Sequence, residues 1–162
     1  MVSAATVSAQ VDVQNGRSLL DEINLRLLAE LQADPRLSMS ALARRVGMSP
    51  PAVRERVQRL EDTGVIAGYR LVVDPAAVGL PVTAWVRIRP EARQLSKVAD
   101  LARNTPEVAE CHRITGEDCF LLRVHVSGLD ALEKVLDRFL MYGQTVSSIV
   151  VSTPVEPRPV LP

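Results

Sequence analysis

Residues 38–60 read SMSALARRVGMSPPAVRERVQRL, and this stretch decides the fold of the N-terminal part of the chain. Ser38 is a good N-cap for a short helix with apolar residues four apart on one face. Gly47 can adopt the left-handed conformation that a tight turn requires. Ser49 and Pro50 suit the N-cap and first position of a second helix, because proline lacks the N–H that would be unpaired there. The stretch therefore predicts a helix-turn-helix.

The second helix of this pair is expected to bury one face and expose the other. Val53, Val57 and Leu60 form an apolar stripe at helical spacing, and Thr63-Gly64 ends the helix. The outward positions are Pro51, Arg54, Glu55, Gln58 and Arg59, with Arg56 at the flank. Arginine matches the O6 and N7 atoms of guanine, glutamine matches adenine, and glutamate can accept from cytosine N4 or brace an arginine four residues on. These residue types predict a DNA recognition helix.

Charge is concentrated in the same stretch although the whole chain is formally neutral. Residues 36–60 hold six arginines and one acid, Glu55, which leaves a local charge of +5. We expect Arg44 and Arg45 to contact phosphates, which position a protein on DNA without reading its sequence. Ser38 and Ser49, at the two helix starts, are further candidate DNA-binding residues. The alternative is a solvated arginine-rich face, but the turn glycine, the cap and the buried stripe favour DNA binding.

A further helix should precede this pair and complete a three-helix domain of the winged type over residues 18–66. Ser18 and Asp21 resemble a capping box, and leucine and isoleucine recur at helical spacing until Asp34-Pro35. Residues 1–17 are small and polar and are expected to form a flexible tail. After Gly64 the pattern changes to β-branched and aromatic residues, which predicts a linker strand and hinge over residues 67–80.

The remainder of the chain alternates between strand and helix patterns and predicts an α+β protein. We expect strands at 82–89, 108–114, 120–126 and 146–153, and helices at 95–103 and 130–141. With right-handed crossovers, this βαββαβ order gives a ferredoxin-like domain, an antiparallel sheet with both helices on one face. The domain should span residues 81–155 and be followed by a proline-rich tail at 156–162.

One face of the predicted sheet carries apolar residues that the helices do not cover. Alternate residues of the first and third strands should face the helices, from Val82 to Ile88 and from Phe120 to Val126. On the other face we place Trp85, Leu121, Ile149 and Val151. A single-layer sheet with the only tryptophan on its open side needs a cover. A second copy of the sheet would supply a dimer interface, and the alternative is the linker strand or a flap of the same chain.

Composition excludes several other classes of protein. A basic segment followed by an apolar block is not seen at the N-terminus, and apolar runs are too short for a membrane span, so we expect a cytoplasmic protein with no membrane partner. Cys111 and Cys119 should stay thiols in a reducing cytosol. A redox pair, or a metal site with His112 and His125, is a weak alternative because the ligand spacing is wrong, so we expect no metal.

The sequence also lacks the groupings that enzymes use. There is no Ser/His/Asp arrangement and no glycine-rich phosphate loop, so we expect a protein that is not an enzyme. The leading hypothesis is a ligand-gated, sequence-specific transcription regulator of double-stranded DNA. Two alternatives remain open: an architectural, nucleoid-type protein that wraps DNA without sensing a ligand, and a metabolic regulatory subunit built on the ferredoxin-like domain.

The segment from Leu19 to Leu80 resembles the N-terminal half of the Lrp/AsnC family, the feast/famine regulators of amino-acid metabolism. The resemblance continues through TGEDCFLL at Thr115–Leu122 and YGQT at Tyr142–Thr145. It implies dimers formed through the C-terminal domains, assembly into tetramers or octamers, and an amino-acid effector held between C-terminal domains. No other cofactor is expected. The resemblance also favours a mechanism in which the effector changes which oligomer is populated.

The same resemblance implies the effector-binding residues. Thr115 and Gly116 would contribute backbone groups, and Glu117 or Asp118 would bind the amino group. Many relatives have aspartate where this chain has Cys119. The segment Tyr142, Gly143, Gln144 and Thr145 would form the matching wall of the site. For Gly116 the alternative is that it only allows a hairpin turn.

Overall fold

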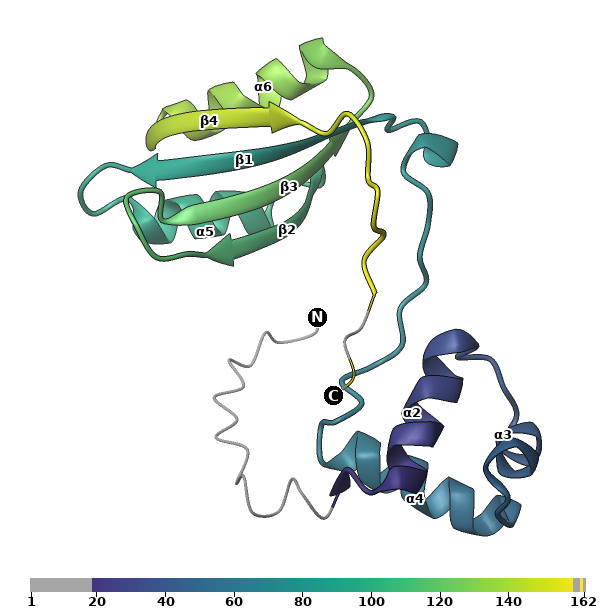
Figure 1. The fold of residues 1–162 in the computed structure, drawn as a ribbon. Coiled ribbons are helices and arrows are strands. Elements are labelled where there is room, and N and C mark those ends of the chain that lie inside the picture. The colour runs from purple at the N-terminus through teal and green to yellow at the C-terminus, as the bar shows by residue number, and fades with distance from the viewer. Residues whose placement is uncertain (1–18, 159–160, 162) are drawn as a thin grey trace. The chain divides into compact units, whose positions relative to one another are not determined.

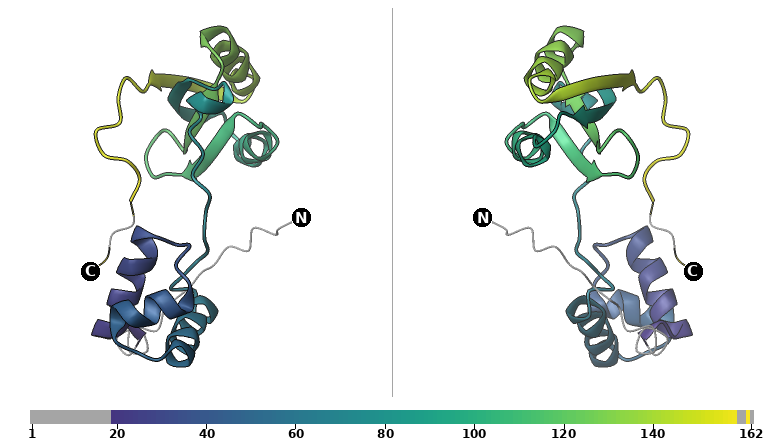
Figure 2. Two further views of the ribbon diagram at one scale, coloured as in Figure 1. Left: turned by 90° about the vertical axis from the view of Figure 1, so that its right-hand side faces the viewer. Right: turned by 90° about the vertical axis from the view of Figure 1, so that its left-hand side faces the viewer.

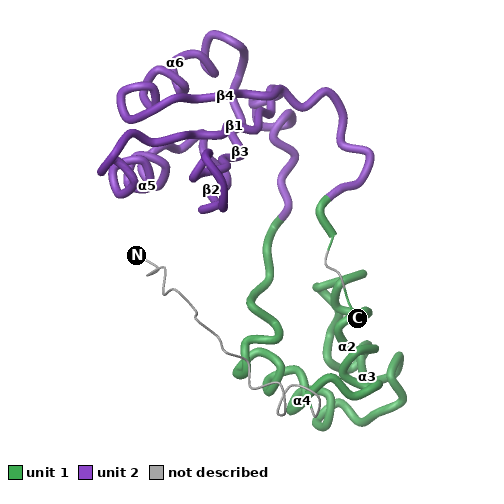
Figure 3. The backbone as a smooth tube through the Cα atoms, turned by 60° about the vertical axis from the view of Figure 1, so that its left-hand side comes forward, with its two compact units in different colours: residues 1–71, 157–162 green, residues 72–156 purple. Residues whose placement is uncertain are grey.

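The computed structural model describes residues 19–158 and 161 and divides the chain into two compact units. Unit 1 comprises residues 1–71 and 157–162, and unit 2 comprises residues 72–156 (Figure 3). Unit 1 contains α2 (Glu22–Ala33), α3 (Met39–Val46) and α4 (Pro50–Asp62) (Figure 1). Unit 2 contains η1 (Ala76–Val78), β1 (Val82–Pro90), α5 (Leu95–Arg103), β2 (Val108–Arg113), β3 (Phe120–Val126), α6 (Leu129–Leu140) and β4 (Gly143–Ile149). Within the described part of the chain, none of the helices has the length and apolar character to span a membrane.

The start of α2 differs from the predicted capping box. Asp21, with an extended backbone, is the N-cap, and its carboxylate accepts from the Asn24 N–H at 2.7 Å. Ser18 lies outside the described residues. Aspartate here satisfies one of the N–H groups that the first turn leaves unpaired. The helix ends at Ala33, immediately before the predicted stop at Asp34-Pro35.

The helix-turn-helix prediction is confirmed. Ser38 caps α3 by accepting from the Ala41 N–H at 3.2 Å, and Gly47 ends it in the left-handed conformation with φ 72°. Ser49 has the extended backbone of an N-cap, but its hydroxyl makes no capping hydrogen bond. Pro50 and Pro51 hold the first two helical positions, and as prolines they have no N–H to donate. The hydroxyl of Ser49 is therefore not used by the helix.

Unit 1 is held together by an apolar core and by polar bonds, among them a cluster around Asn24. The buried core consists of Leu27, Leu28, Leu31, Leu42, Ala43, Val46, Val53, Val57 and Leu60. Asn24 is also buried, and its amide donates to the Leu19 carbonyl at 2.8 Å. The Arg56 guanidinium donates to Asn24 Oδ1 at 3.0 Å and to Asp21 at 2.7 Å. Arg56 thus ties α4 to the start of α2.

The linker after α4 is not the strand that the sequence predicts. Residues 67–73 form no strand pairing within the described part of the chain. Leu71 and Val72 are 90% and 91% exposed. A β-branched segment without a neighbouring backbone to bond with stays extended but unpaired. The hinge that follows contains η1, which ends at Gly79 with φ 85°.

Unit 2 is a four-stranded antiparallel sheet in the order β2-β3-β1-β4, with α5 and α6 on one side (Figures 1 and 2). This confirms the ferredoxin-like prediction. The alternation of β1 and β3 is confirmed as well, because their helix-facing residues build the core. That core consists of Ala84, Val86, Ile88, Val98, Ala102, Phe120, Leu122, Val124, Val126, Leu132, Val135 and Phe139.

Two residues predicted for the open face, Ile149 and Val151, do not lie on it in the structure. β4 begins at Gly143, three residues earlier than expected, and ends at Ile149. Ile149 is the register partner of Ala84, whose side chain faces the helices. Directly opposed residues point to the same face, so Ile149 lies on the helix side and not beside Trp85. Val151 lies beyond the strand and is 96% exposed.

Gly143 allows β4 to approach β1 closely. It pairs with Pro90, and a Cβ built on it would lie 2.2 Å from the Arg89 carbonyl oxygen and 2.7 Å from Pro90 Cα. These neighbours are backbone atoms, which cannot move aside as the end of a flexible side chain can. Only glycine fits this position without a shift of the strand.

Replacing Asp21 by asparagine should make unit 1 less stable in a pH-dependent way. The Arg56 guanidinium, followed by the Asn24 N–H, holds the pKa of the Asp21 carboxyl below its ordinary value. The pair therefore stabilises the fold above the unfolded-state pKa of about 3.9, and this stabilisation is lost as the pH falls through the folded-state pKa. Because the pair is partly exposed, we expect a loss of about 0.5–1 kcal/mol at neutral pH that vanishes as the pH falls through the folded-state pKa. Hydrogen exchange of α2 amides measures it.

The control for this experiment is Glu22→Gln, which removes a charge from the same helical turn without touching the Arg56 bond. Asparagine at position 21 keeps a capping acceptor, so the comparison isolates the ion pair. An identical pH dependence in the two variants would show that the bond to Arg56 is not the cause.

Replacing Gly143 by alanine should weaken unit 2. The added methyl group forces β4 away from the Arg89 carbonyl, and we expect the free energy of unfolding to fall by about 1–3 kcal/mol. Denaturation followed by the fluorescence of Trp85 measures this change. Ser147→Ala, at an exposed position of the same strand away from the open face, should change stability by less than about 0.5 kcal/mol. Equal stability of the Gly143→Ala variant and the unaltered protein would contradict the close contact.

Candidate functional site

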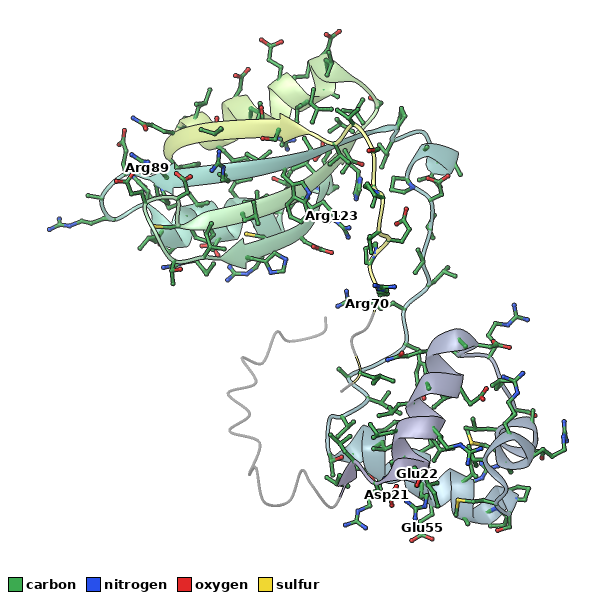
Figure 4. The ribbon with its side chains drawn as sticks, in the orientation of Figure 1. Asp21, Glu22, Glu55, Arg70, Arg89 and Arg123 are labelled. Atoms are coloured by element: carbon green, nitrogen blue, oxygen red, sulfur yellow. The ribbon has the colours of Figure 1, made fainter. Side chains whose placement is uncertain are left out.

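Helix α4 presents the face that the sequence predicts. Val53, Val57 and Leu60 are buried, which leaves the opposite side to solvent. The exposed side chains are Pro51, Arg54, Glu55, Gln58 and Arg59. An open hollow is lined by Pro50 and by four of these residues, all except Arg59. Figure 4 shows Glu55 on this helix. The helix from Pro50 to Gln58 therefore exposes hydrogen-bonding side chains that no other described residue covers.

Two predicted DNA-contacting arginines are engaged within the protein. Arg56 is half-buried and bonds to Asp21 and Asn24 of the α2 start. Arg45 pairs with Glu30 of α2 at 2.5 Å. Arg44 is exposed and forms no ion pair with a described residue. The structure thus separates Arg44, which is available to a ligand, from Arg45 and Arg56, which join helices.

The other polar residues of α4 differ in their local partners. Gln58 donates to Asp62 at 2.9 Å across one helical turn. The predicted brace between Glu55 and Arg59 is not formed among the described residues. Both side chains are exposed and are open to an external partner.

The loop between β2 and β3 forms the first wall of the predicted effector site. The Ile114 N–H donates to the Cys119 carbonyl at 3.0 Å and closes the loop. Gly116 has φ 105°, which a residue with a side chain rarely adopts, and no heavy atom lies near a Cβ built there. This conformation supports a turn-forming role for Gly116. Cys119 packs against the core of unit 2, and its thiol lies 3.8 Å from the Glu117 carbonyl.

Two arginines of β1 that sequence reasoning missed hold the acids of this loop. Arg89, labelled in Figure 4, pairs with Glu117 at 2.5 Å and with Asp118 at 3.5 Å. Arg87 lies 3.8 Å from Asp118. The signal was present in the sequence, since arginine alternates with apolar residues in Val86-Arg87-Ile88-Arg89. Such alternation places both arginines on the open face, opposite the core.

The second predicted wall lies against the same end of β1. The Glu91 N–H donates to the Tyr142 carbonyl at 2.9 Å, and Gly143 pairs with Pro90. Gln144 is the register partner of Arg89, and Thr145 is the partner of Ile88. The ammonium group of Lys97 lies 6.0 Å from the centre of the Tyr142 ring. The loop at 115–119 and the segment at 142–145 thus flank the end of β1 from its two neighbouring strands.

The open face of the sheet mixes apolar and charged residues. Trp85 and Leu121 lie on it, as predicted, and the register adds Val146, the partner of Arg87. Arg123 pairs with Glu110 at 2.5 Å, and His125 shares a 2.9 Å hydrogen bond with Thr83. Burial, followed by the nearby positive charge of Arg123, lowers the pKa of His125. The imidazole is therefore neutral at pH 7.

Cys111 and Cys119 are free thiols. Burial raises the pKa of the Cys111 thiol, although Arg103 opposes this effect. A raised pKa lowers the thiolate fraction that reacts with oxidants or metals. Among the residues that the structure describes, no three of His, Cys, Asp and Glu gather into a group that could hold a metal ion.

Comparison with known proteins identifies both halves of the chain. Residues 20–67 match the model of a winged helix-turn-helix DNA-binding domain, and residues 83–160 match the Lrp/AsnC ligand binding domain. The chain is 36% identical to the HTH-type transcriptional regulator LrpC of Bacillus subtilis, over 82% of this chain and 92% of that protein. It is 38% identical to the regulator LrpA of Mycobacterium tuberculosis, over 83% of this chain and 91% of that protein.

A solved structure shows the same fold. The feast or famine regulatory protein of Mycobacterium tuberculosis, complexed with L-methionine, is 37% identical and superposes with a TM-score of 0.82 over 88% of this chain and 99% of that one. The matched relatives are regulators and not enzymes. The fold, the helix-turn-helix and the ligand-binding domain all agree with these matches. The chain belongs to the Lrp/AsnC family of DNA-binding transcription regulators.

Proposed function

We propose that the exposed side of α4 reads the major groove of DNA. One observation carries the proposal: α4 buries an apolar stripe and exposes Arg54, Gln58 and Arg59 on its other side. Arginine can bond in bidentate fashion to guanine, and glutamine can bond to adenine. Glu55 adds an acceptor for cytosine N4. Base reading by this helix gives the regulator its sequence specificity.

The phosphate contacts come from residues that the protein does not use for its own packing. Arg44 is exposed and unpaired among the described residues, and the Ser49 hydroxyl is not used as a helix cap. Both suit phosphate oxygens. Arg45 and Arg56 stabilise the domain instead, because their guanidinium groups already bond to α2.

Replacing Arg59 by alanine should lower specificity, and replacing Arg44 by alanine should lower affinity for all DNA. The test compares a duplex selected by the protein from a random pool with a scrambled duplex, both at about 150 mM salt because phosphate contacts depend on salt. We expect Arg59→Ala to lose about 1–3 kcal/mol of binding to the selected duplex only. Arg44→Ala should weaken binding to both duplexes alike. It should also lower, by about one, the magnitude of the slope of the logarithm of the binding constant against the logarithm of the salt concentration. Equal losses on both duplexes for the two variants would refute this division of roles.

The effector of unit 2 is an amino acid in this proposal. Support comes from the ligand-binding domain match over residues 83–160 and from the similar regulator that was solved with L-methionine. The two segments expected to hold it, 115–119 and 142–145, flank the same end of β1. A ligand at this end would contact charged and backbone groups, as an amino-acid head group requires.

The open face of the sheet is the surface through which two copies join. Trp85, Leu121 and Val146 offer apolar area there, and a second sheet would remove it from water. Further association into tetramers or octamers would place several helix-turn-helix domains on one DNA. An effector that binds one assembly more tightly than another changes which of them is populated, and so alters DNA binding.

Replacing Leu121 by arginine should dissociate the dimer. The added charge would be buried in the joined faces without a partner, so we expect sedimentation to show at least a tenfold rise in the dimer dissociation constant, on the order of 1.4 kcal/mol or more. Val151→Arg adds the same charge at a fully exposed site outside the strand and should leave the mass unchanged. Unaltered mass of the Leu121→Arg variant would mean that the copies join through another surface.

A further inference from the structure

We propose that Arg89 determines the class of effector by binding its carboxylate, and that the effector replaces Glu117 on this arginine. The inference rests on the proposed amino-acid function of the 115–119 loop. It adds a specificity-determining residue from β1, outside both segments that the sequence indicates. The ligand then carries a carboxylate and an ammonium group on one small molecule.

The bond between Arg89 and Glu117 can be exchanged easily. Within a single copy of the chain the distance is 2.5 Å, and the side chains of Glu117 and Arg89 are 80% and 46% exposed. Ion pairs between exposed side chains stabilise a protein by little, because water competes for both charges and the side chains lose freedom. A ligand carboxylate can take the same donors in the same geometry, since guanidinium binds any carboxylate through paired N–H groups.

The bond between the arginines and Asp118 keeps the site in place during this exchange. Asp118 is more buried than Glu117, with 24% of its side chain exposed. Its carboxylate lies 3.5 Å from Arg89 and 3.8 Å from Arg87. Asp118 is therefore a positioning residue that holds the two guanidinium groups near each other. Arg89 keeps one partner within the protein while its other partner is exchanged.

The cluster around Arg89 has no net charge, and this favours a ligand that carries both a negative and a positive group. Arg87, Arg89, Glu117 and Asp118 carry two positive and two negative charges, so the cluster has no excess of either sign. When a ligand carboxylate displaces Glu117, the released glutamate is an acceptor for a cation close by. An α-amino acid supplies the carboxylate and an ammonium group together. An amine alone offers no carboxylate to Arg89, and a 2-oxo acid binds Arg89 but offers no cation to the released Glu117.

Calorimetry with matched ligands tests the inference on the full chain. The unaltered protein is titrated with L-methionine and the other proteinogenic L-amino acids. The tightest binder is then compared with its decarboxylated amine and with its 2-oxo acid. The same titrations are made with Arg89→Gln and with Arg103→Gln, which removes an exposed pair with Asp100 on α5.

We expect Arg89→Gln to bind the amino acid about ten- to a hundredfold more weakly, as loss of a charged hydrogen bond predicts. Its preference for the amino acid over the amine should disappear, a change that a purely structural role would not cause. Arg103→Gln should behave like the unaltered protein in both respects.

The outcomes separate the two levels of the proposal. If the unaltered protein binds an amino acid and Arg89→Gln binds it with the same affinity and the same preference over the amine, the role of Arg89 is refuted and the amino-acid function stands. If the unaltered protein binds none of the amino acids, the proposed function fails and the role of Arg89 fails with it. Circular dichroism of Arg89→Gln confirms that the variant is folded.

Discussion

The alternation of side chains along β1 is the constraint on which unit 2 depends. The strand lies between β3 and β4, so its register fixes both neighbours. Ala84, Val86 and Ile88 point to the helices and are buried. The residues between them must then point the other way. One strand thereby divides the domain into a core and an open face that bears Trp85 and two arginines.

Much of this fold follows from the sequence because the relevant patterns are strong. Helix α5 and strand β3 begin and end where periodicity predicts. Apolar residues recur at helical spacing in α5, and every second residue of β3 from Phe120 to Val126 is apolar. The helix-turn-helix is equally clear, because Gly47 and the Ser49-Pro50 pair mark the turn from both sides. Local signals of this kind do not depend on distant parts of the chain.

What the sequence could not show depends on contacts between distant residues. The face of Ile149 follows from its pairing with Ala84, and the edge strand β4 has too few apolar residues to reveal that pairing by its own pattern. The role of Arg56 depends on Asp21, thirty-five residues earlier. Helical spacing places Arg56 at the flank of α4, but the spacing within α4 holds no information about α2. For the candidate effector site, the motif indicates the loop residues 115–119 only, because Arg89 belongs to another strand.

The two prolines at the start of α4 have a consequence for how the helix can meet an anion. A helix N-terminus usually holds a phosphate through its first backbone N–H groups and its dipole. Pro50 and Pro51 remove two of these donors, while their rings fix the backbone before any partner arrives. In the proposed complex with DNA, the start of α4 would act through its shape and its side chains, and it would lose little conformational entropy on docking.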